Sequence, residues 1–363
     1  MVDSYHMGLL IWRCGNYATL TKGQKMHSIT LDDAIELAKK YMTDATIGLE
    51  IEVLDPLQNE QKVIRMANTE GIKIVSRGYT HEVLKEWKFV DDGSVNGREL
   101  VSPPLKPQRL FKELKEILDI LVICGYKVDR SCSVHVHHDA SKYNNKRLRY
   151  FLNHVVKNEV NFDCLVAQSR RDGRWCRSMK NELDCLVQSL DSNEMHLCNE
   201  WGIHQAPNGE RIGRNGRGSA RYRKWNFHSF SAYRTLECRQ HQGSLEFSKI
   251  VLWLALTQNM VTRCKTKVNY TKGWDNPMCN LLISLGFAKR SGKAIKPICP
   301  LAKWVCESVV ARMEYFSFAD RAPELDLTPD HLELDFYGTR VYIKGCGWTT
   351  KAKLMELFPS LII

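Results

Sequence analysis

Three stretches of the chain alternate between apolar and polar residues, the pattern of a strand with one face in a core. They are residues 45–54, 132–139 and 235–239. A fourth region, residues 87–102, contains the turn signal Asp92-Gly93 between two extended runs, which predicts a hairpin. Gly243 ends the last strand before a long apolar helix. The pattern therefore predicts several antiparallel strands with one polar face.

Helical periodicity marks the segments between these strands. Apolar stripes predict helices at residues 31–42, 106–125, 144–168 and 245–264. Residues 225–230 are rich in aromatic side chains and are predicted to form a strand that leads into residues 235–239. Nearer the C-terminus we expect helices at 281–288 and 301–316, a hairpin at 336–344 and a final helix at 349–357. Together these elements predict an α+β fold, with an antiparallel sheet flanked by helices.

The polar strand faces carry acids and histidines. Glu50 and Glu52 share one face of residues 45–54, and carboxylates so placed repel each other unless a cation lies between them. His135 and His137 share a face of residues 132–139, an arrangement that suits contact with a metal or a phosphate. Taken one at a time, these stretches are explained equally well as solvated strand faces and structural histidines.

Residues 234–239 add an acid and a base. Glu237 and Arg239 lie on the same side of a strand, where they form an ion pair or hold a metal and an anion side by side. Carboxylates gathered on inward faces need cations, and Mg²⁺ prefers oxygen ligands. The pattern predicts two or three Mg²⁺ ions with arginines binding phosphate, although the chain has no Gly-Lys-Ser/Thr phosphate loop. The combined set is Glu50, Glu52, Glu99, His135, His137 and Glu237, with Arg234 and Arg239 beside it.

Composition narrows the class of protein. The 363 residues carry a formal net charge of +11, which favours an anionic partner such as a nucleotide, a nucleic acid or an acidic substrate. Residues 211–224 form a dense basic cluster interrupted by glycines, which suits either polyphosphate binding or a solvated loop. The 13 cysteines include no CxxC pair, so we expect reduced thiols in the cytoplasm. No run of 18 apolar residues and no signal peptide occur, so we expect no membrane contact.

Four short motifs, in this order along the chain, resemble the amidoligase family, which is related to glutamate–cysteine ligase, glutamine synthetase and other carboxylate–amine ligases. The resemblance covers roughly residues 45–265, and Cys238 stands where an aromatic residue is more usual. The motifs are Gly48-Leu-Glu-Ile-Glu52, Asp92-Gly-Ser94 with Glu99-Leu-Val-Ser-Pro103, Val134-His-Val-His137, and Tyr222 to Asn226 followed by Thr235-Leu-Glu-Cys-Arg239 with Gly243-Ser244.

The resemblance implies a sheet that forms a funnel-like active site, and ATP- and Mg²⁺-dependent ligation of a carboxylate to an amine through an acyl phosphate. Arg239 is then expected to hold the transferred phosphoryl group, and Arg234 the nucleotide or the acid substrate. His137 is expected near the nucleotide phosphates, and Asp92 and Ser94 near the incoming amine. The residues expected to bind Mg²⁺ are Glu50, Glu52, Glu99, His135 and Glu237.

This interpretation divides the chain into an extension at 1–44, a catalytic domain at 45–265 and a C-terminal accessory region at 266–363. Three alternatives remain open on sequence grounds. The net charge and the 211–224 cluster also suit a nucleic-acid-binding protein. The glutamates and histidines also suit a metal-dependent hydrolase or nuclease, which would need no ATP. The third alternative is a degenerate, inactive relative of the carboxylate–amine ligases. The acid and amine substrates, and whether they are small molecules, peptides or protein side chains, are not encoded in any recognisable motif.

Overall fold

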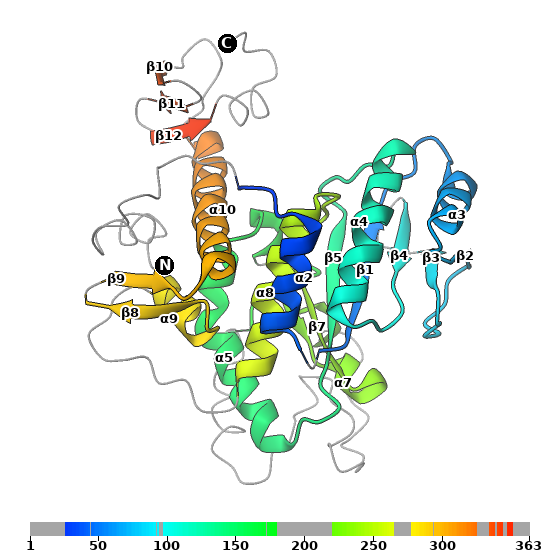
Figure 1. Ribbon diagram of the computed structural model, residues 1–363, viewed down its shortest axis with the longest axis horizontal. Helices are drawn as coiled ribbons and strands as arrows, with labels where there is room; N and C mark the ends of the chain where they lie inside the picture. The colour runs from blue at the N-terminus through cyan, green and yellow to red at the C-terminus, as the bar shows by residue number, and fades with distance from the viewer. Residues whose placement is uncertain are drawn as a thin grey trace. The chain divides into compact units, whose positions relative to one another are not determined.

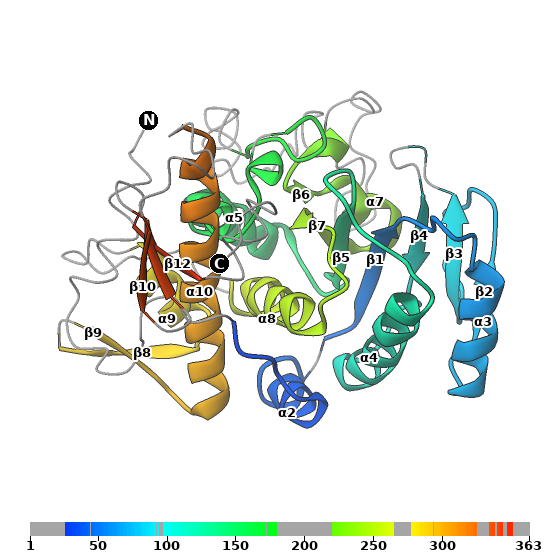
Figure 2. The same ribbon diagram turned by 90° about the horizontal axis from the view of Figure 1, so that it is seen from above.

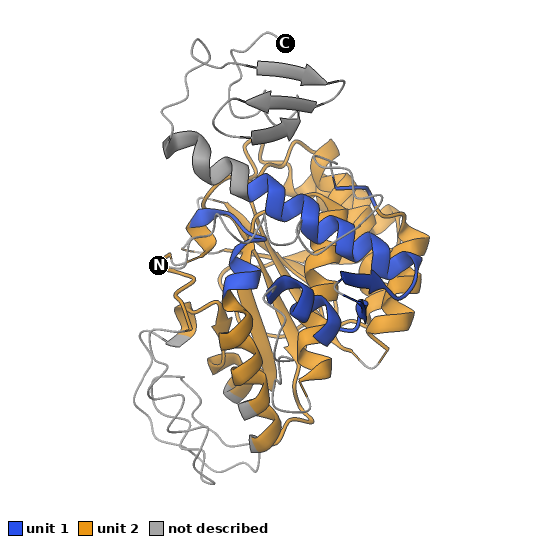
Figure 3. Ribbon diagram, turned by 90° about the vertical axis from the view of Figure 1, so that its left-hand side faces the viewer, with its two compact units in different colours: residues 1–28, 160–168, 269–363 blue, residues 29–159, 169–268 orange. Residues whose placement is uncertain are grey.

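The computed structural model describes residues 26–43, 45–91, 93, 97–171, 173–179, 220–264, 277–292, 294–324, 334–337, 340–343 and 347–350. The chain divides into two compact units, coloured separately in Figure 3. The larger unit comprises residues 29–159 and 169–268, and the smaller one residues 1–28, 160–168 and 269–363. Each is described separately below.

A seven-stranded open sheet organises the larger unit, in the order β2-β3-β4-β1-β5-β7-β6 (Figure 1). All neighbouring strands in it are antiparallel except β2 and β3, which are parallel. The predicted mixed fold with a mostly antiparallel sheet is therefore confirmed. The strands are β1 (Ile47–Val53), β2 (Ile74–Ser76), β3 (Trp87–Asp91), β4 (Arg98–Val101), β5 (Ser133–Asp139), β6 (Trp225–Asn226) and β7 (Thr235–Gln242).

Helices cover one face of this sheet. Figure 2 shows α4 (Pro107–Ile123) and α8 (Phe247–Arg263) along that face, and α2 (Leu31–Tyr41) packs against both helices. Phe111 of α4 meets Phe247 of α8 edge to face, with ring centroids 6.3 Å apart. The apolar side of β1 points into this core, where each aliphatic side chain contributes roughly 1.5–3 kcal/mol by burial. Its fully buried members are Ile47, Leu49, Ile51 and Val53.

Local sequence signals account for the helix ends. Thr30 caps α2, because its hydroxyl accepts a hydrogen bond from the Asp33 backbone N–H at 3.1 Å. Gly125 follows the end of α4 with a φ of +83°, a conformation that glycine adopts without a steric cost. The other helices with all or most of their residues in this unit are α3 (Glu60–Thr69), α5 (Asn145–Asp163) and α7 (His228–Tyr233), and two short 3₁₀ turns lie at Gln168–Arg170 and Ala220–Tyr222.

The structure differs from the sequence prediction at two places in this unit. Helix α5 ends at Asp163, short of residue 168. The predicted strand at 225–230 has only the two residues of β6 before α7 begins. The cause is Asn226, whose Oδ1 accepts a hydrogen bond from the His228 backbone N–H at 2.9 Å and turns the chain.

The pairing of β5 with β7 contains a bulge. Val136 lies opposite Cys238, but Val134 lies opposite His241, so β7 has one extra residue in this interval. Such a bulge changes which way the following side chains point. His241 therefore returns to the helix-covered face, where its ring lies 5.1 Å from that of Trp253 in α8.

The smaller unit contains α9 (Pro277–Ser284), a hairpin of β8 (Ala288–Ser291) and β9 (Ala294–Pro297), and the long α10 (Pro300–Glu324). A three-stranded sheet follows, made of β10 (Leu334–Tyr337), β11 (Arg340–Ile343) and β12 (Gly347–Thr350). The predicted hairpin corresponds to β10 and β11. The predicted final helix does not begin at Thr349, because β12 runs through Thr350; residues 351–357 lie outside the described part. None of the helices that the structure describes is long and apolar enough to cross a bilayer.

Candidate metal centre

The strand register gathers the predicted acids and histidines of the site on the sheet face opposite the core. Glu50 of β1 lies opposite His135 of β5, and Glu52 lies opposite Glu99 of β4. His137 lies opposite Glu237 of β7. Four separate strands therefore bring their polar positions to one place, as the alternation predicted.

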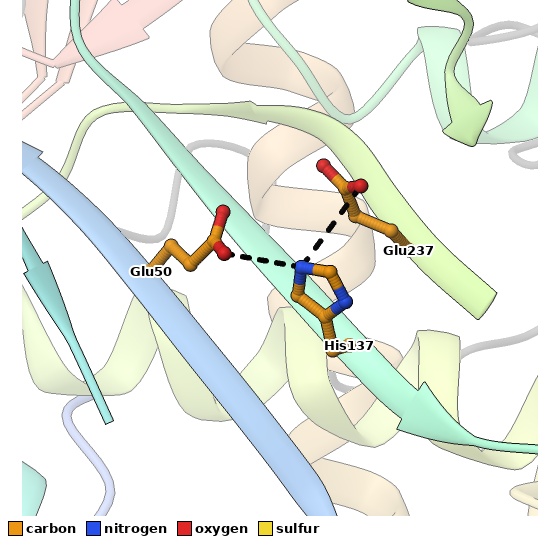
Figure 4. Close-up of side chains that lie close together, drawn as sticks. All are labelled: Glu50, His137 and Glu237. Carbon is orange, nitrogen blue, oxygen red and sulfur yellow. Dashed lines mark ion pairs between the residues drawn. The ribbon is translucent and has the colours of Figure 1, made fainter. Parts of the chain in front are cut away.

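Glu50 connects the two histidines. Its Oε1 lies 3.2 Å from Nε2 of His137, and its Oε2 lies 3.2 Å from Nδ1 of His135. Glu237 approaches His137 from the other side, with 3.9 Å between Oε2 and Nε2 (Figure 4). The remaining ring nitrogen of His137 shares a hydrogen bond of 3.0 Å with the Thr235 hydroxyl, which fixes the ring orientation.

A second group forms around His135. Its Nδ1 lies 3.9 Å from Oε1 of Glu99, and its Nε2 lies 3.8 Å from Oε1 of Glu52. Nε2 also shares a hydrogen bond of 2.7 Å with the hydroxyl of Ser133. The backbone N–H of Ser133 donates to Oε2 of Glu52 at 2.7 Å, so Ser133 orients one histidine and one carboxylate.

Charges within the cluster shift the pKa values of His137 and Glu50 in opposite directions. Burial disfavours the charged form of His137, but Glu50 and Glu237 outweigh burial and raise the pKa of His137 to about 9. Burial likewise favours the neutral form of Glu50, yet the charge of His137 and the hydrogen bonds to both histidines hold the Glu50 pKa well below its usual range. The lowered pKa of Glu50 and the raised pKa of His137 therefore favour the charged forms of both side chains.

The donor atoms fit a divalent cation. Two sets of three residues could each hold a cation. Every residue in a set offers one ligand atom, and the three ligand atoms of a set lie within 4.8 Å of one another. One set is Glu50, His137 and Glu237, and the other is Glu50, Glu99 and His135. Carboxylate oxygens suit Mg²⁺ and Mn²⁺, and imidazole nitrogens suit transition metals. His137, predicted to contact phosphates, is placed as well for a metal as His135 is.

Arg239 lies at the edge of the cluster. Its Nη1 donates to Oε1 of Glu237 at 2.5 Å, and its Nε has no hydrogen-bond partner among the described residues. Burial opposes the charge of Arg239, but Glu237 outweighs burial and raises the Arg239 pKa. Arg234 ends α7 in the left-handed conformation, with its guanidinium 5.2 Å from the ring centroid of Phe230. The anion-binding roles expected of both arginines stay predictions.

Some predicted residues cannot be compared with the structure. Asp92, Ser94 and residues 211–219 of the basic cluster lie outside the described residues. Glu52, in contrast, is only 3% exposed and lies on an internal strand of the sheet, which excludes its interpretation as a solvated carboxylate on an edge strand.

Sequence reasoning missed Lys88. The register places it in the same row of the polar face as Glu50, with Val101 of β4 between them. Lys88 is buried, and its Nζ donates to the Glu82 carbonyl at 2.6 Å. Burial lowers its pKa, while Glu50 and Glu99 oppose that shift. The available signal was a lysine within the otherwise apolar run at residues 87–90.

The geometry defines this chain as a mixed helix-and-sheet protein with a candidate metal centre on one face of an open sheet. A family model described as "Putative amidoligase enzyme" matches residues 43–261. The chain belongs to this family, which confirms the resemblance seen in its motifs. A search of curated proteins returned no match to the chain.

Proposed function

We propose that this protein is an ATP-dependent carboxylate–amine ligase that forms an amide bond through an acyl phosphate. The family supports a ligase in general. The observation that carries the finer proposal is the position of Glu50, which lies 3.2 Å from each of two histidines and shares donor sets with Glu99 and Glu237. This arrangement suits cations that would bind phosphate oxygens, with Arg239 beside them.

The chemistry requires activation of the acid. A carboxylate is anionic and resonance-stabilised, so an amine does not displace its oxygen. Attack of the carboxylate oxygen on the γ-phosphorus of ATP forms an acyl phosphate and releases ADP. The amine nitrogen then attacks the acyl carbon, the C–O bond breaks, inorganic phosphate leaves and the nitrogen loses a proton. The largest demand on the protein is to neutralise phosphate charge, which preorganised cations and arginines do.

The residues divide this work as follows. Glu50, Glu52, Glu99, His135 and Glu237 would hold Mg²⁺, which neutralises phosphate charge when bound. His137, half-buried between Glu50 and Glu237, is oriented by its hydrogen bond to Thr235 and would contact either metal or phosphate.

The groups nearest the substrates complete the proposal. Arg239 would bind the phosphoryl group being transferred, because its guanidinium presents several donors and Glu237 supports its charge. Arg234 would bind the nucleotide or the acid. Asp92 and Ser94 would bind the amine, since a carboxylate attracts an ammonium group and accepts its proton. A cytoplasmic location belongs to the same proposal.

The test is phosphate release from ATP and Mg²⁺ against panels of acids and amines, with mass spectrometry of each mixture. A product lighter than its two reactants by one water, formed only with ATP, would support the ligase and identify both substrates. The variant Glu50→Gln should form none. Hydrolysis of a substrate without ATP would instead indicate a metal-dependent hydrolase, and salt-dependent binding of nucleic acid without nucleotide turnover would indicate a nucleic-acid-binding protein.

A further inference from the structure

One peptide group lies between a buried arginine and a carboxylate of the candidate metal centre. The carbonyl oxygen of Cys132 accepts a hydrogen bond from Nη2 of Arg170 at 2.7 Å. The N–H of the same peptide group belongs to Ser133, and it donates to Oε2 of Glu52 at 2.7 Å. A continuous chain of hydrogen bonds thus runs from Arg170 to Glu52.

Arg170 is built into the fold. It ends the short 3₁₀ turn at Gln168–Arg170 and is 6% exposed. Its Nη2 also donates to the Ser131 carbonyl at 3.1 Å, and its Nε has no hydrogen-bond partner among the described residues. A buried guanidinium that contacts only uncharged carbonyls is costly unless a negative charge lies near. Glu52 acts on Arg170 as such a charge, opposing the effect of burial on the Arg170 pKa.

The effect on Glu52 follows from the polarity of the peptide. A charged donor on the carbonyl oxygen draws electron density toward that oxygen, which makes the N–H of the same group a stronger donor. One oxygen of Glu52 is thereby fixed. The other, Oε1, faces the cluster, 3.8 Å from Nε2 of His135. The hydroxyl of Ser133 holds the same ring nitrogen at 2.7 Å.

We propose that Arg170 is a positioning residue of the metal centre, which acts on Glu52 through the Cys132–Ser133 peptide. Arg239 differs, because it contacts a candidate ligand, Glu237, directly. The inference rests on the proposed function only in requiring that this cluster binds a divalent cation. It does not depend on ATP or on the identity of the substrates.

The fold offers a way to remove Arg170 without removing the strand. The Cys132 carbonyl also accepts a hydrogen bond from the Gly243 N–H at 2.7 Å. β5 pairs with β1 on one side and β7 on the other. Arg170→Gln should therefore leave β5 in place while weakening the hold on Glu52.

Arg147 provides a matched control. Its Nη2 also donates to two successive carbonyls, those of Val261 and Thr262, each at 3.3 Å. Its guanidinium packs 4.2 Å from the ring centroid of Tyr143. Arg147→Gln thus removes a similar structural arginine that contacts no residue of the cluster in these hydrogen bonds.

The experiment titrates the full-length protein with Mn²⁺ alone and measures free Mn²⁺ by electron paramagnetic resonance. Arg170→Gln should weaken Mn²⁺ binding roughly 10- to 100-fold, the usual effect of losing a partner that orients a ligand. Arg170→Lys, which keeps a charged donor, should recover part of that loss, and Arg147→Gln should match the wild type. Because Arg170 acts through Glu52, Arg170→Gln should have little further effect in a Glu52→Gln background.

Each other result overturns a defined part of the argument. If the wild type binds no Mn²⁺, the metal centre fails, and this inference fails with it. If the wild type binds Mn²⁺ and Arg170→Gln binds it equally well, only the role of Arg170 is wrong. An equal loss in Arg147→Gln would show a general structural effect. Additive losses in the double variant would show that Arg170 does not act through Glu52.

Discussion

Arg239 and Glu237, two residues apart on β7, are joined by a hydrogen bond of 2.5 Å between Nη1 and Oε1. The other oxygen of Glu237 accepts from Nδ2 of Asn226, also at 2.5 Å. A carboxylate oxygen has more than one lone pair, so these bonds orient Glu237 and still leave it able to bind a cation. The same strand therefore presents a candidate metal ligand beside a guanidinium that we expect to bind an anion.

Glu237→Gln should abolish both ligation and nucleotide-dependent Mg²⁺ binding while the fold stays intact. The amide keeps the size of the side chain but removes the charge that attracts the metal and pairs with Arg239. We expect a loss of turnover of roughly 100-fold or more, measured as phosphate release and product mass. Glu246→Gln, which removes a surface carboxylate paired with Lys249, is the control. Wild-type activity in Glu237→Gln would eliminate the proposed site.

Lys88→Met should tighten Mn²⁺ binding. The buried ammonium group of Lys88 interacts with the charges of Glu50 and Glu99. Without Lys88, these carboxylates should attract a metal ion more strongly. An effect of about 1 kcal/mol, or roughly fivefold in affinity, is expected for a partly screened charge. Calorimetric titration would compare Lys88→Met with Lys88→Arg, which keeps the charge and should change the affinity less. Weaker binding in Lys88→Met would mean that its bond to the Glu82 carbonyl matters more than its charge.

Lys224→Met should destabilise the fold. Lys224 and Glu159 form an ion pair of 3.0 Å in which both side chains are nearly inaccessible to solvent. Loss of one partner leaves a buried charge, which typically costs about 3–5 kcal/mol. Urea denaturation should show this loss, and Glu159→Gln combined with Lys224→Met should be less destabilising than Lys224→Met alone. If the single variant is as stable as the wild type, the pair contributes nothing to folding.

Gly243→Ala should also reduce stability, by about 1–3 kcal/mol. A Cβ at this position would lie 2.5 Å from Cβ of Cys132 and 3.1 Å from the Cys132 backbone. The strand that carries His135 would have to move. Thermal unfolding would compare this variant with Gly78→Ala, where the nearest atom to an added Cβ is 3.8 Å away. Equal unfolding temperatures in the two variants would contradict this explanation.

The local pattern of the sequence was sufficient to predict which side chains share a face. Alternation alone put Glu50 with Glu52 and Glu237 with Arg239, because the two-residue period of a strand is a property of the backbone. The recurrence of acids and histidines on these polar faces then grouped the strands into one predicted site, before the resemblance to amidoligases was considered. The hairpin at 87–102 is likewise confirmed by the antiparallel pairing of β3 and β4.

Other features depend on which strands become neighbours, and no local pattern encodes that. Lys88 joins the row of Glu50 only because β4 lies between β3 and β1. Arg170 reaches the Cys132 carbonyl across 38 residues of sequence. The bulge in β7 interrupts the alternation of side chains after Arg239. The two-residue period of a strand therefore could not predict which face of the sheet His241 lies on.

Glu50 belongs to both three-residue donor sets, with one carboxylate oxygen near each histidine. Two cations held by these two sets would both depend on Glu50 for a ligand and would repel each other. The second ion should therefore bind more weakly than the first, and the binding isotherm should show negative cooperativity. An anion that spans both ions would screen that repulsion. By thermodynamic reciprocity, such an anion and the second cation would each strengthen the binding of the other, so the centre would fill completely only when a phosphate-bearing ligand is present.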